Sequence, residues 1–342
     1  MLDLTIFDVS AFVYQGTSSE SFKNRFFYNY PVGGIHYLMR YLTPALIDRD
    51  SVILAFDSRD NFRKKLMPDY KAGRVPNKTV ITQIDTLFNE LSGCGFSCYR
   101  VDGYEGDDII SWACNQNFNK FSKITIYGND RDLLHNVRGK ILFRSINSGI
   151  NSIMESNFSY AVEKGKNIPF NTISFNKVLC GCTSDKVPSF VSENGYKGQE
   201  LFDIYLHAFQ IKKLPFSYEY TTNVPLFLKI METTELLTAK DLSDLQKRIK
   251  IIFPAENPEE AEIIPDDIKS INEDLFCYFL TKYNDLASLR CMQYKKMMLT
   301  AEDVDELRKK AYDLSSGAVA VDKEISVHNV DDIGQCLFMK EF

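Results

Sequence analysis

The chain has 342 residues, of which 44% are hydrophobic and 25% charged, and its formal net charge is −6. These values are typical of a globular protein with a sizeable core, and no run of 18 apolar residues predicts a membrane span. The N-terminus lacks the basic segment and cleavage site of a signal peptide. The eight cysteines are scattered without zinc-site spacing, so we expect reduced thiols in a cytoplasmic protein.

The negative net charge disfavours a nucleic-acid partner only when it is averaged over the whole chain. Residues 59–74 hold six basic and two acidic residues, whereas residues 254–267 hold six acidic residues and no basic one. Charge is therefore segregated along the chain, and a local basic surface stays compatible with the composition.

Apolar strands alternate with amphipathic helices over the first 150 residues. The predicted strands are 4–8, 52–57, 97–103, 123–130 and 139–146, and the predicted helices are 32–47, 81–95 and 109–117. This alternation predicts an α/β fold with a mostly parallel central sheet flanked by helices. Beyond about residue 205, the helical patterns at 239–249, 273–290 and 301–314 predict a helical C-terminal domain.

Seven carboxylates lie at strand ends or at a strand-to-helix junction. They are Asp8, Asp57, Glu105, Asp107, Asp108, Asp130 and Asp132. Any one of them alone is explained by a helix cap or a turn, and Asp107 or Asp108 suits the start of helix 109–117. Ligands bind beyond the carboxyl ends of parallel strands, so the seven are expected to converge on one crevice. Crowded oxygen ligands without histidine favour Mg²⁺ or Mn²⁺.

A carboxylate site of this kind suits phosphodiester hydrolysis. Two cations about 4 Å apart hold the phosphate and activate a water without a nucleophilic side chain, and no phosphate-binding G-x-x-x-x-G-K-[ST] loop is present. At such a site, the basic segment that follows Asp57 is expected to bind phosphates or to stack on bases. Its candidate residues are Arg63, Lys64, Lys65, Tyr70, Lys71 and Arg74. The alternative is a solvated, charged helix face.

The order of these motifs resembles that of the 5′-nuclease superfamily: flap endonucleases, the 5′→3′ exonuclease domain of bacterial DNA polymerase I, and phage 5′-exonucleases and RNase H. The similar segments run from residue 1 to about 205 and comprise "IFDVSAFVYQG", "PVGGIHYLMRYL", "AFDSRDNFRKKLMPDYKAGR", "GYEGDDII", "IYGNDRDLLHNV" and "LCGCTSDKVPSFVSENGYKG". Gly106 stands where the family usually has alanine. The resemblance implies a PIN-like, resolvase-like domain at 1–175, followed at 176–342 by helix–hairpin–helix and helical DNA-binding parts.

The resemblance also implies a role for each site residue. The first metal ion would be held by Asp8, Asp57, Glu105 and Asp107, and the second by Asp107, Asp130, Asp132 and Asp185. Asp108 is expected beside the ions as an outer ligand or a helix cap. Lys71 and Arg74 would steer the scissile phosphate while Tyr70 stacks on the terminal base. Two Mg²⁺ ions are expected, with Mn²⁺ as a substitute.

Three departures from the family pattern lie in the helix–hairpin–helix segment. Cys182 replaces a usual aspartate, which predicts a weakened or Mn²⁺-preferring second metal site, and Lys186 replaces a usual asparagine. The hairpin is also poor in glycine. Gly195 and Lys197 remain as its candidates for backbone and phosphate contact with DNA, and a K⁺ site there is left open.

The resemblance implies a structure-specific 5′-nuclease of a bacterium or phage-infected cell. It would act on branched or 5′-ended DNA and on RNA/DNA hybrids during replication or repair, by 5′→3′ exonuclease, flap-endonuclease or RNase H activity. The tail 333–342 loosely resembles peptides that bind a sliding clamp, although docking of the terminus onto the body is the favoured explanation. One alternative is a non-catalytic DNA-junction-binding relative. The other is a phosphatase-type hydrolase with Asp8 as nucleophile, which Ser10 at the usual second aspartate disfavours.

Overall fold

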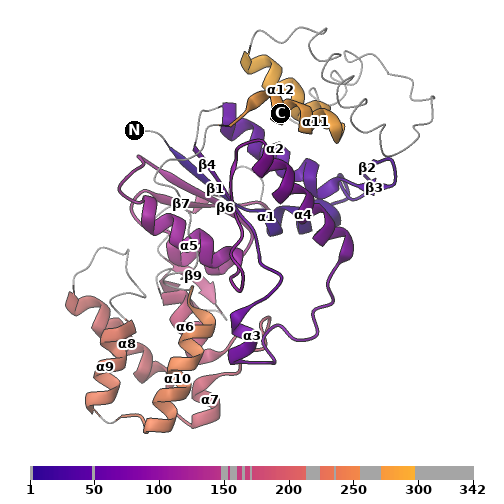
Figure 1. Cartoon of the computed structure of the whole chain (residues 1–342). Coiled ribbons are helices and arrows are strands. Elements are labelled where there is room, and N and C mark those ends of the chain that lie inside the picture. The colour runs from indigo at the N-terminus through magenta and orange to yellow at the C-terminus, as the bar shows by residue number, and fades with distance from the viewer. Residues whose placement is uncertain are drawn as a thin grey trace. The chain divides into compact units, whose positions relative to one another are not determined.

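The computed structural model describes residues 3–47, 51–147, 153–154, 160–163, 166–169, 172–212, 224–234, 236–254 and 271–296. The predicted helix at 301–314, nearly all of the acidic segment 254–267 and the tail 333–342 lie outside these residues. Two compact units are present (Figure 1). The first comprises Met1–Phe12, Ser51–Lys78 and Ser97–Ile268, and the second comprises Val13–Asp50, Thr79–Phe96 and Lys269–Phe342. This division follows compactness rather than activity, so the domain boundary at residues 175/176 stays a prediction.

The first unit is built on a mostly parallel sheet, as the sequence predicts. Its strand order is β5-β4-β1-β6-β7-β8, with the first five strands parallel and β8 antiparallel at the edge. The strands are β1 (Leu4–Asp8), β4 (Ser51–Ala55), β5 (Ser97–Tyr99), β6 (Ile124–Gly128), β7 (Ile141–Ser145) and β8 (Ile153–Met154). Strand β1 is central, because Leu4 pairs with Ser51 on one side and with Ile124 on the other. The ends of β4 and β6 therefore flank the end of β1.

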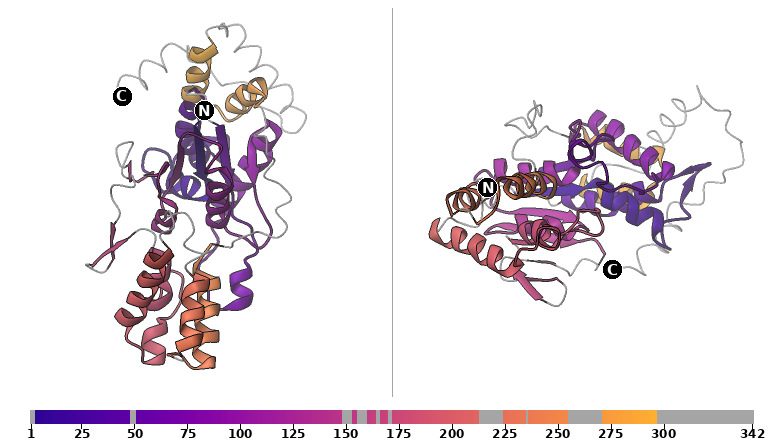
Figure 2. Two further views of the ribbon diagram at one scale, coloured as in Figure 1. Left: turned by 90° about the vertical axis from the view of Figure 1, so that its left-hand side faces the viewer. Right: turned by 90° about the horizontal axis from the view of Figure 1, so that it is seen from below.

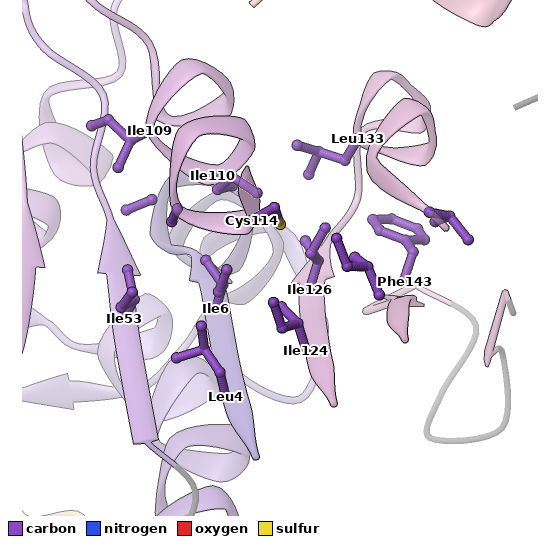
Figure 3. Packing of buried hydrophobic residues seen from close by; sticks show 14 of the residues in the cluster. Leu4, Ile6, Ile53, Ile109, Ile110, Cys114, Ile124, Ile126, Leu133 and Phe143 are labelled. Carbon is purple, nitrogen blue, oxygen red and sulfur yellow. The ribbon is translucent and has the colours of Figure 1, made fainter. Parts of the chain in front are cut away.

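Alternate residues of the strands form one core with helix α5 (Gly106–Asn117). Leu4 and Ile6 of β1 join Ile53 and Ile126 on this face, and Ile110 of α5 packs over them (Figure 3). On the other face, Phe7 of β1 and Leu54 of β4 are buried as well, so apolar side chains cover both faces at the centre of the sheet. Burial on both faces is expected of a parallel sheet, and it explains why these strands read as continuous apolar runs.

A second core lies among the helices that follow the sheet in the first unit. It stacks Phe175 on Tyr205 with ring centroids 3.8 Å apart, and Phe227 meets both rings edge-on. The helices gathered there (Figure 2) are α6 (Ile173–Cys180), α7 (Phe190–Asn194), α8 (Gly198–Lys212), α9 (Val224–Thr234) and α10 (Ala239–Ile252). In the chain, the antiparallel pair of β9 (Tyr160–Glu163) and β10 (Lys166–Pro169) comes after the strands of the sheet and before α6.

The second unit is mainly helical. It contains most of α1 (Val9–Ser18) and α4 (Lys78–Gly93), together with α2 (Gly33–Ile47), α11 (Glu273–Lys282), α12 (Leu286–Lys296) and the short strands β2 (Phe26–Phe27) and β3 (Tyr30–Pro31). The single helix predicted at 273–290 is wrong, because the structure has two helices there. Asn284 takes a left-handed conformation with φ of 56°, and Asp285 Oδ1 accepts a hydrogen bond from Ser288 N at the start of α12. None of the helices in the described ranges combines enough length and apolarity to cross a membrane.

Within the second unit, glycines allow the backbones of α1 and α2 to pack directly against each other. A Cβ placed on Gly34 would lie 2.9 Å from Val13 Cα, and one on Gly16 would lie 2.5 Å from Gly33 O. These are backbone contacts that no side-chain rotation relieves. The "PVGG" motif is therefore explained by close helix packing.

The Gly34→Ala variant is expected to lower the free energy of unfolding by about 1–3 kcal/mol, as overpacking does in other cores. Gly93→Ala is the matched control, since a Cβ there meets nothing within 4 Å and its effect should stay within about 1 kcal/mol. Urea unfolding of both proteins provides the measurement. Equal stabilities of the two variants would contradict the close approach of the helices.

Candidate active site

Three aspartates lie at the carboxyl ends of adjacent strands. Asp8 ends β1, and Asp57 and Asp130 each stand two residues beyond the ends of β4 and β6. Burial, together with the charges of Asp57 and Asp130, raises the pKa of Asp8 to about 7. The structure therefore brings these three predicted residues together at one edge of the sheet.

The amino end of α5 supplies the next group of carboxylates. Asp57 Oδ1 accepts a hydrogen bond from Gly106 N at 2.7 Å, which fixes the first turn of α5 beside the end of β4. Burial, with the charges of Asp130, Asp8 and Glu105, raises the pKa of Asp107 well above its ordinary value. A Cβ on Gly106 would lie 3.3 Å from Asp57 Oδ1, so glycine at this position gives the aspartate more room than alanine would.

Asp132 belongs to the same group but has a partner of its own. It lies in the first turn of the short 3-10 helix η1 (Arg131–Asn136), where its backbone N–H donates to Asp130 Oδ1 at 2.9 Å. Its side chain forms an ion pair with Lys177 of α6. Burial and the charge of Asp130 raise the pKa of Asp132 to about 6, whereas Lys177 lowers it.

The carboxylates surround a small cavity of about 30 Å³. Five of the predicted ligands line it: Glu105, Asp107, Asp130, Asp132 and Asp185. This volume suits a water molecule or a small ion. Within the described part of the chain, however, no three His, Cys, Asp or Glu side chains are already arranged to hold a metal ion. The predicted residues thus gather, but their oxygens are not yet in coordination geometry.

Protein cations occupy several of these oxygens. Lys71 Nζ lies 2.5 Å from Glu105 Oε1, and Arg74 pairs with Asp185 at 2.7 Å. Burial lowers the pKa of Lys71, but Glu105, Tyr70 and Asp185 together raise it, so that the net shift is upward. Lysine and arginine therefore supply part of the positive charge that the crowded carboxylates require.

Arg63 is placed differently from the sequence prediction, whereas Asp108 takes the predicted alternative of a helix cap. Arg63 is 3% exposed and Asp108 is 0% exposed, and they form a two-pronged ion pair at 2.7 and 2.6 Å. The guanidinium also donates to Ile251 O and Phe253 O, at the carboxyl end of α10. Both carboxylate oxygens of Asp108 are engaged, one of them also by Glu105 N at 2.9 Å. Arg63 is thus unavailable to phosphates, and Asp108 serves the helix rather than a metal ion.

Tyr70 also departs from its predicted role in base stacking. Its ring is 3% exposed and packs with Val187 and Ile251, and its hydroxyl donates to Glu105 Oε2 at 3.0 Å. A buried ring cannot stack on a nucleotide without a rearrangement. Tyr70 instead holds Glu105 in place through this hydrogen bond.

The remaining predicted basic residues are solvent-accessible. Lys64, Lys65, Lys186 and Lys197 are exposed, and the Arg74 side chain is 55% exposed. Gly195 ends α7 in the left-handed conformation with φ of 74°, and α8 begins three residues later, which gives the predicted helix–hairpin–helix arrangement. These residues keep their predicted role as candidates for nucleic-acid contact.

Two cations that form ion pairs with carboxylates were missed from the sequence. Lys177 lies in the apolar stretch "ISFNKVLC", where a lone lysine was the available signal. Arg248 of α10 is buried, and it pairs with Asp244 at 2.8 Å and also with Glu193 of α7. Its spacing of four residues from Asp244 was visible, but its contact with α7 depends on the fold.

The sequence and fold were compared with those of known proteins. The family of the 5′-3′ exonuclease N-terminal resolvase-like domain matches residues 3–163. DNA polymerase I of Caldicellulosiruptor bescii is 25% identical over 263 residues, which are 73% of this chain and 29% of that protein. The 5′-3′ exonuclease of Mycoplasma genitalium is 27% identical over 198 residues, which are 57% of this chain and 66% of that protein. The alignments thus span less than two thirds of either relative.

Among solved structures, the T5 D15 protein co-crystallised with metal ions has a similar fold. Its TM-score is 0.51 at 12% identity, and the match covers 92% of this chain and 99% of that chain. The resemblance found in the sequence motifs is therefore confirmed by an independent family match and by the fold. Residues 3–163 thus match the family of the 5′-3′ exonuclease N-terminal resolvase-like domain, and these matches support the resemblance to the 5′-nuclease superfamily that the motifs indicate.

Proposed function

We propose that the protein is a divalent-metal-dependent, structure-specific 5′-nuclease that hydrolyses phosphodiesters near a 5′ end or a single-strand/duplex junction. The observation that carries this proposal is the crowding of Asp8, Asp107 and Asp130 at one edge of the sheet. Burial and mutual repulsion raise the pKa of Asp8 to about 7 and that of Asp107 well above its ordinary value. Such an arrangement is costly unless cations offset it.

The donor set fits a hard divalent cation. Asp8, Asp57, Glu105 and Asp107 would hold the first ion, since carboxylate oxygens suit Mg²⁺ and Mn²⁺. The ion, when bound, supplies charge stabilisation and a water of lowered pKa. The described residues do not yet have coordination geometry. The carboxylate of Glu105 must therefore move away from Lys71 before both of its oxygens can bind the ion.

The protein's own cations account for the handling of the phosphate. Lys71 is close enough to Asp8 and Asp107 to lower the pKa of each, so its ammonium faces the reacting region. Arg74 lies three residues further along, exposed at the rim beside Asp185. The exposed Lys64, Lys65, Lys186 and Lys197 would bind phosphates of the substrate away from the cut.

The substrate classes follow from the family. We propose branched or 5′-ended DNA, with RNA/DNA hybrids as a further substrate in an RNase H type of reaction. The helix–hairpin–helix around Gly195 would hold the duplex by its backbone, and residues 176–342 would form the DNA-binding part next to the nuclease domain 1–175. Clamp binding by 333–342 stays a prediction, because the tail lies outside the described residues.

Cleavage assays test the proposal. We expect the purified protein to release short 5′ products from a 5′-flap duplex and an RNA-primed duplex in Mg²⁺ or Mn²⁺, but not in a chelator. Product lengths distinguish exonuclease from endonuclease cleavage. Tight junction binding without cleavage in either metal would contradict the nuclease and favour the non-catalytic alternative.

A further inference from the structure

The groups expected to hold a second metal ion are already occupied within the protein. Besides Asp107, which the first site shares, and Asp130, this second site depends on Asp132, Asp185 and the position of Cys182. Asp132 is paired with Lys177, and Asp185 Oδ1 accepts from Arg74 at 2.7 Å. Asp185 Oδ2 lies 3.4 Å from Cys182 Sγ, a neutral thiol where an aspartate is usual. Of these three positions, two have a carboxylate that is paired with a cation, and the third has a thiol in place of a carboxylate.

Lys177 is held firmly in its place. Its neighbours Val178 and Leu179 on α6 are 0% and 1% exposed and belong to the aromatic core around Phe175. The lysine side chain itself is only 18% exposed, so its stem lies within the protein while the ammonium meets Asp132. The buried helix face thus fixes the position of the lysine backbone, from which the side chain reaches Asp132.

The turn that carries Cys182 and Asp185 is fixed as well. Cys182 N donates to Val187 O at 2.8 Å, and Val187 N donates to Cys182 O at 2.9 Å. Lys71 N donates to Asp185 O at 2.9 Å, which ties the turn to the basic segment. The thiol therefore cannot be exchanged for another ligand by a small movement of the loop.

The first-ion ligands differ from this arrangement. Among the described residues, no salt bridge involves Asp8, Asp57 or Asp107, and only Glu105 of that set is paired with a cation. On the first-ion side, the ion pairs of the described residues meet Glu105 alone, so three of the four expected ligands have none. On the second-ion side, Asp132 and Asp185 each have an ion pair. The two halves of the carboxylate cluster therefore differ in how many expected ligands the protein's own cations occupy.

We infer that the ammonium of Lys177 takes the place of the second divalent cation beside Asp132, so that the protein binds one divalent ion tightly and a second only weakly. This inference rests on the proposed function, since it concerns the same site. The two divalent ions that the family resemblance implies would therefore bind this chain with different affinities, because of Lys177 and Cys182 together.

Titration of the full-length protein with Mn²⁺, followed by the electron paramagnetic resonance signal of the free ion, tests the inference without any activity measurement. We expect one ion bound tightly and a second at least about tenfold more weakly. Lys177→Met should strengthen the second binding about tenfold, and Lys177→Met with Cys182→Asp should bring it near the first. Lys177→Arg keeps the charge and should leave the second ion weakly bound.

The wild-type titration separates the possible failures, even if a variant does not fold. Two ions of equal affinity in the wild type would overturn the role of Lys177 while leaving the proposed nuclease intact. No tightly bound ion would overturn the metal site itself, and with it both proposals. Unchanged second-ion affinity in folded Lys177→Met, with Lys64→Met as the control for loss of an exposed charge, would also overturn the inference.

Discussion

The Asp130→Asn protein is expected to cleave a 5′-flap duplex in Mg²⁺ at least about 10³-fold more slowly than the wild type, which corresponds to about 4 kcal/mol of barrier. Asp130 lies beyond β6, lines the cavity of the site and contributes to the raised pKa values of Asp8 and Asp107. Replacing its carboxylate by an amide removes a negative charge from the place where the cation is expected. The loss should therefore fall on catalysis.

The same substitution should leave the fold intact. Asp130 Oδ1 accepts a hydrogen bond from Asp132 N at the start of η1, and an asparagine oxygen caps the helix equally well. Removal of one of several repelling carboxylates should if anything raise the free energy of unfolding in the absence of metal. Circular dichroism and urea unfolding check the fold alongside the cleavage rate.

Asp203→Asn provides the matched control for Asp130→Asn. Asp203 is an exposed aspartate of α8 that accepts from Gln199 at 2.8 Å, outside the carboxylate cluster, so its amide variant should cleave like the wild type. Cleavage by Asp130→Asn within about threefold of the wild type would contradict the metal site placed at this edge of the sheet. Equal losses in both variants would point to a general electrostatic effect on DNA binding.

The gathering of the carboxylates was predictable because parallel strands impose it. Each apolar run ends near an aspartate, and β1 lies between β4 and β6, so Asp8, Asp57 and Asp130 had to meet at the same edge. The strand that was predicted to extend to residue 57 ends at Ala55, and Asp57 stands beyond it. The topological rule tolerates such small errors, since it depends on strand order and not on the last residue.

The roles of the basic residues were less predictable because a cation's function depends on its partner. Arg63, Lys64 and Lys65 are adjacent in the sequence, yet one is buried and the other two are exposed. The partners of Arg63 lie 45 and 188 residues away, at Asp108 and Ile251, and no local pattern indicates them. Lys177 was missed for the same reason.

The Arg63→Leu protein is expected to lose about 3–5 kcal/mol of unfolding free energy, the usual cost of removing one partner from a buried ion pair. The buried carboxylate of Asp108 would lose the guanidinium that pairs with both of its oxygens, and Ile251 O and Phe253 O would lose the N–H groups that Arg63 donates. Lys64→Leu, on the same helix α3 (Phe62–Leu66) but exposed, should change stability by less than about 0.5 kcal/mol. Urea unfolding of the two variants measures the difference.

A double-mutant cycle shows whether this loss comes from the uncompensated carboxylate. If it does, Arg63→Leu with Asp108→Leu should recover part of the stability lost in Arg63→Leu, although Glu105 N then loses its acceptor. If the double variant is no more stable than Arg63→Leu, the bonds from the guanidinium to the carboxyl end of α10 carry the effect instead. Either result explains why an arginine in a basic segment is buried: it joins α10 to the first turn of α5, which carries Glu105 and Asp107. A loss below about 1 kcal/mol in Arg63→Leu would contradict the burial of the pair itself.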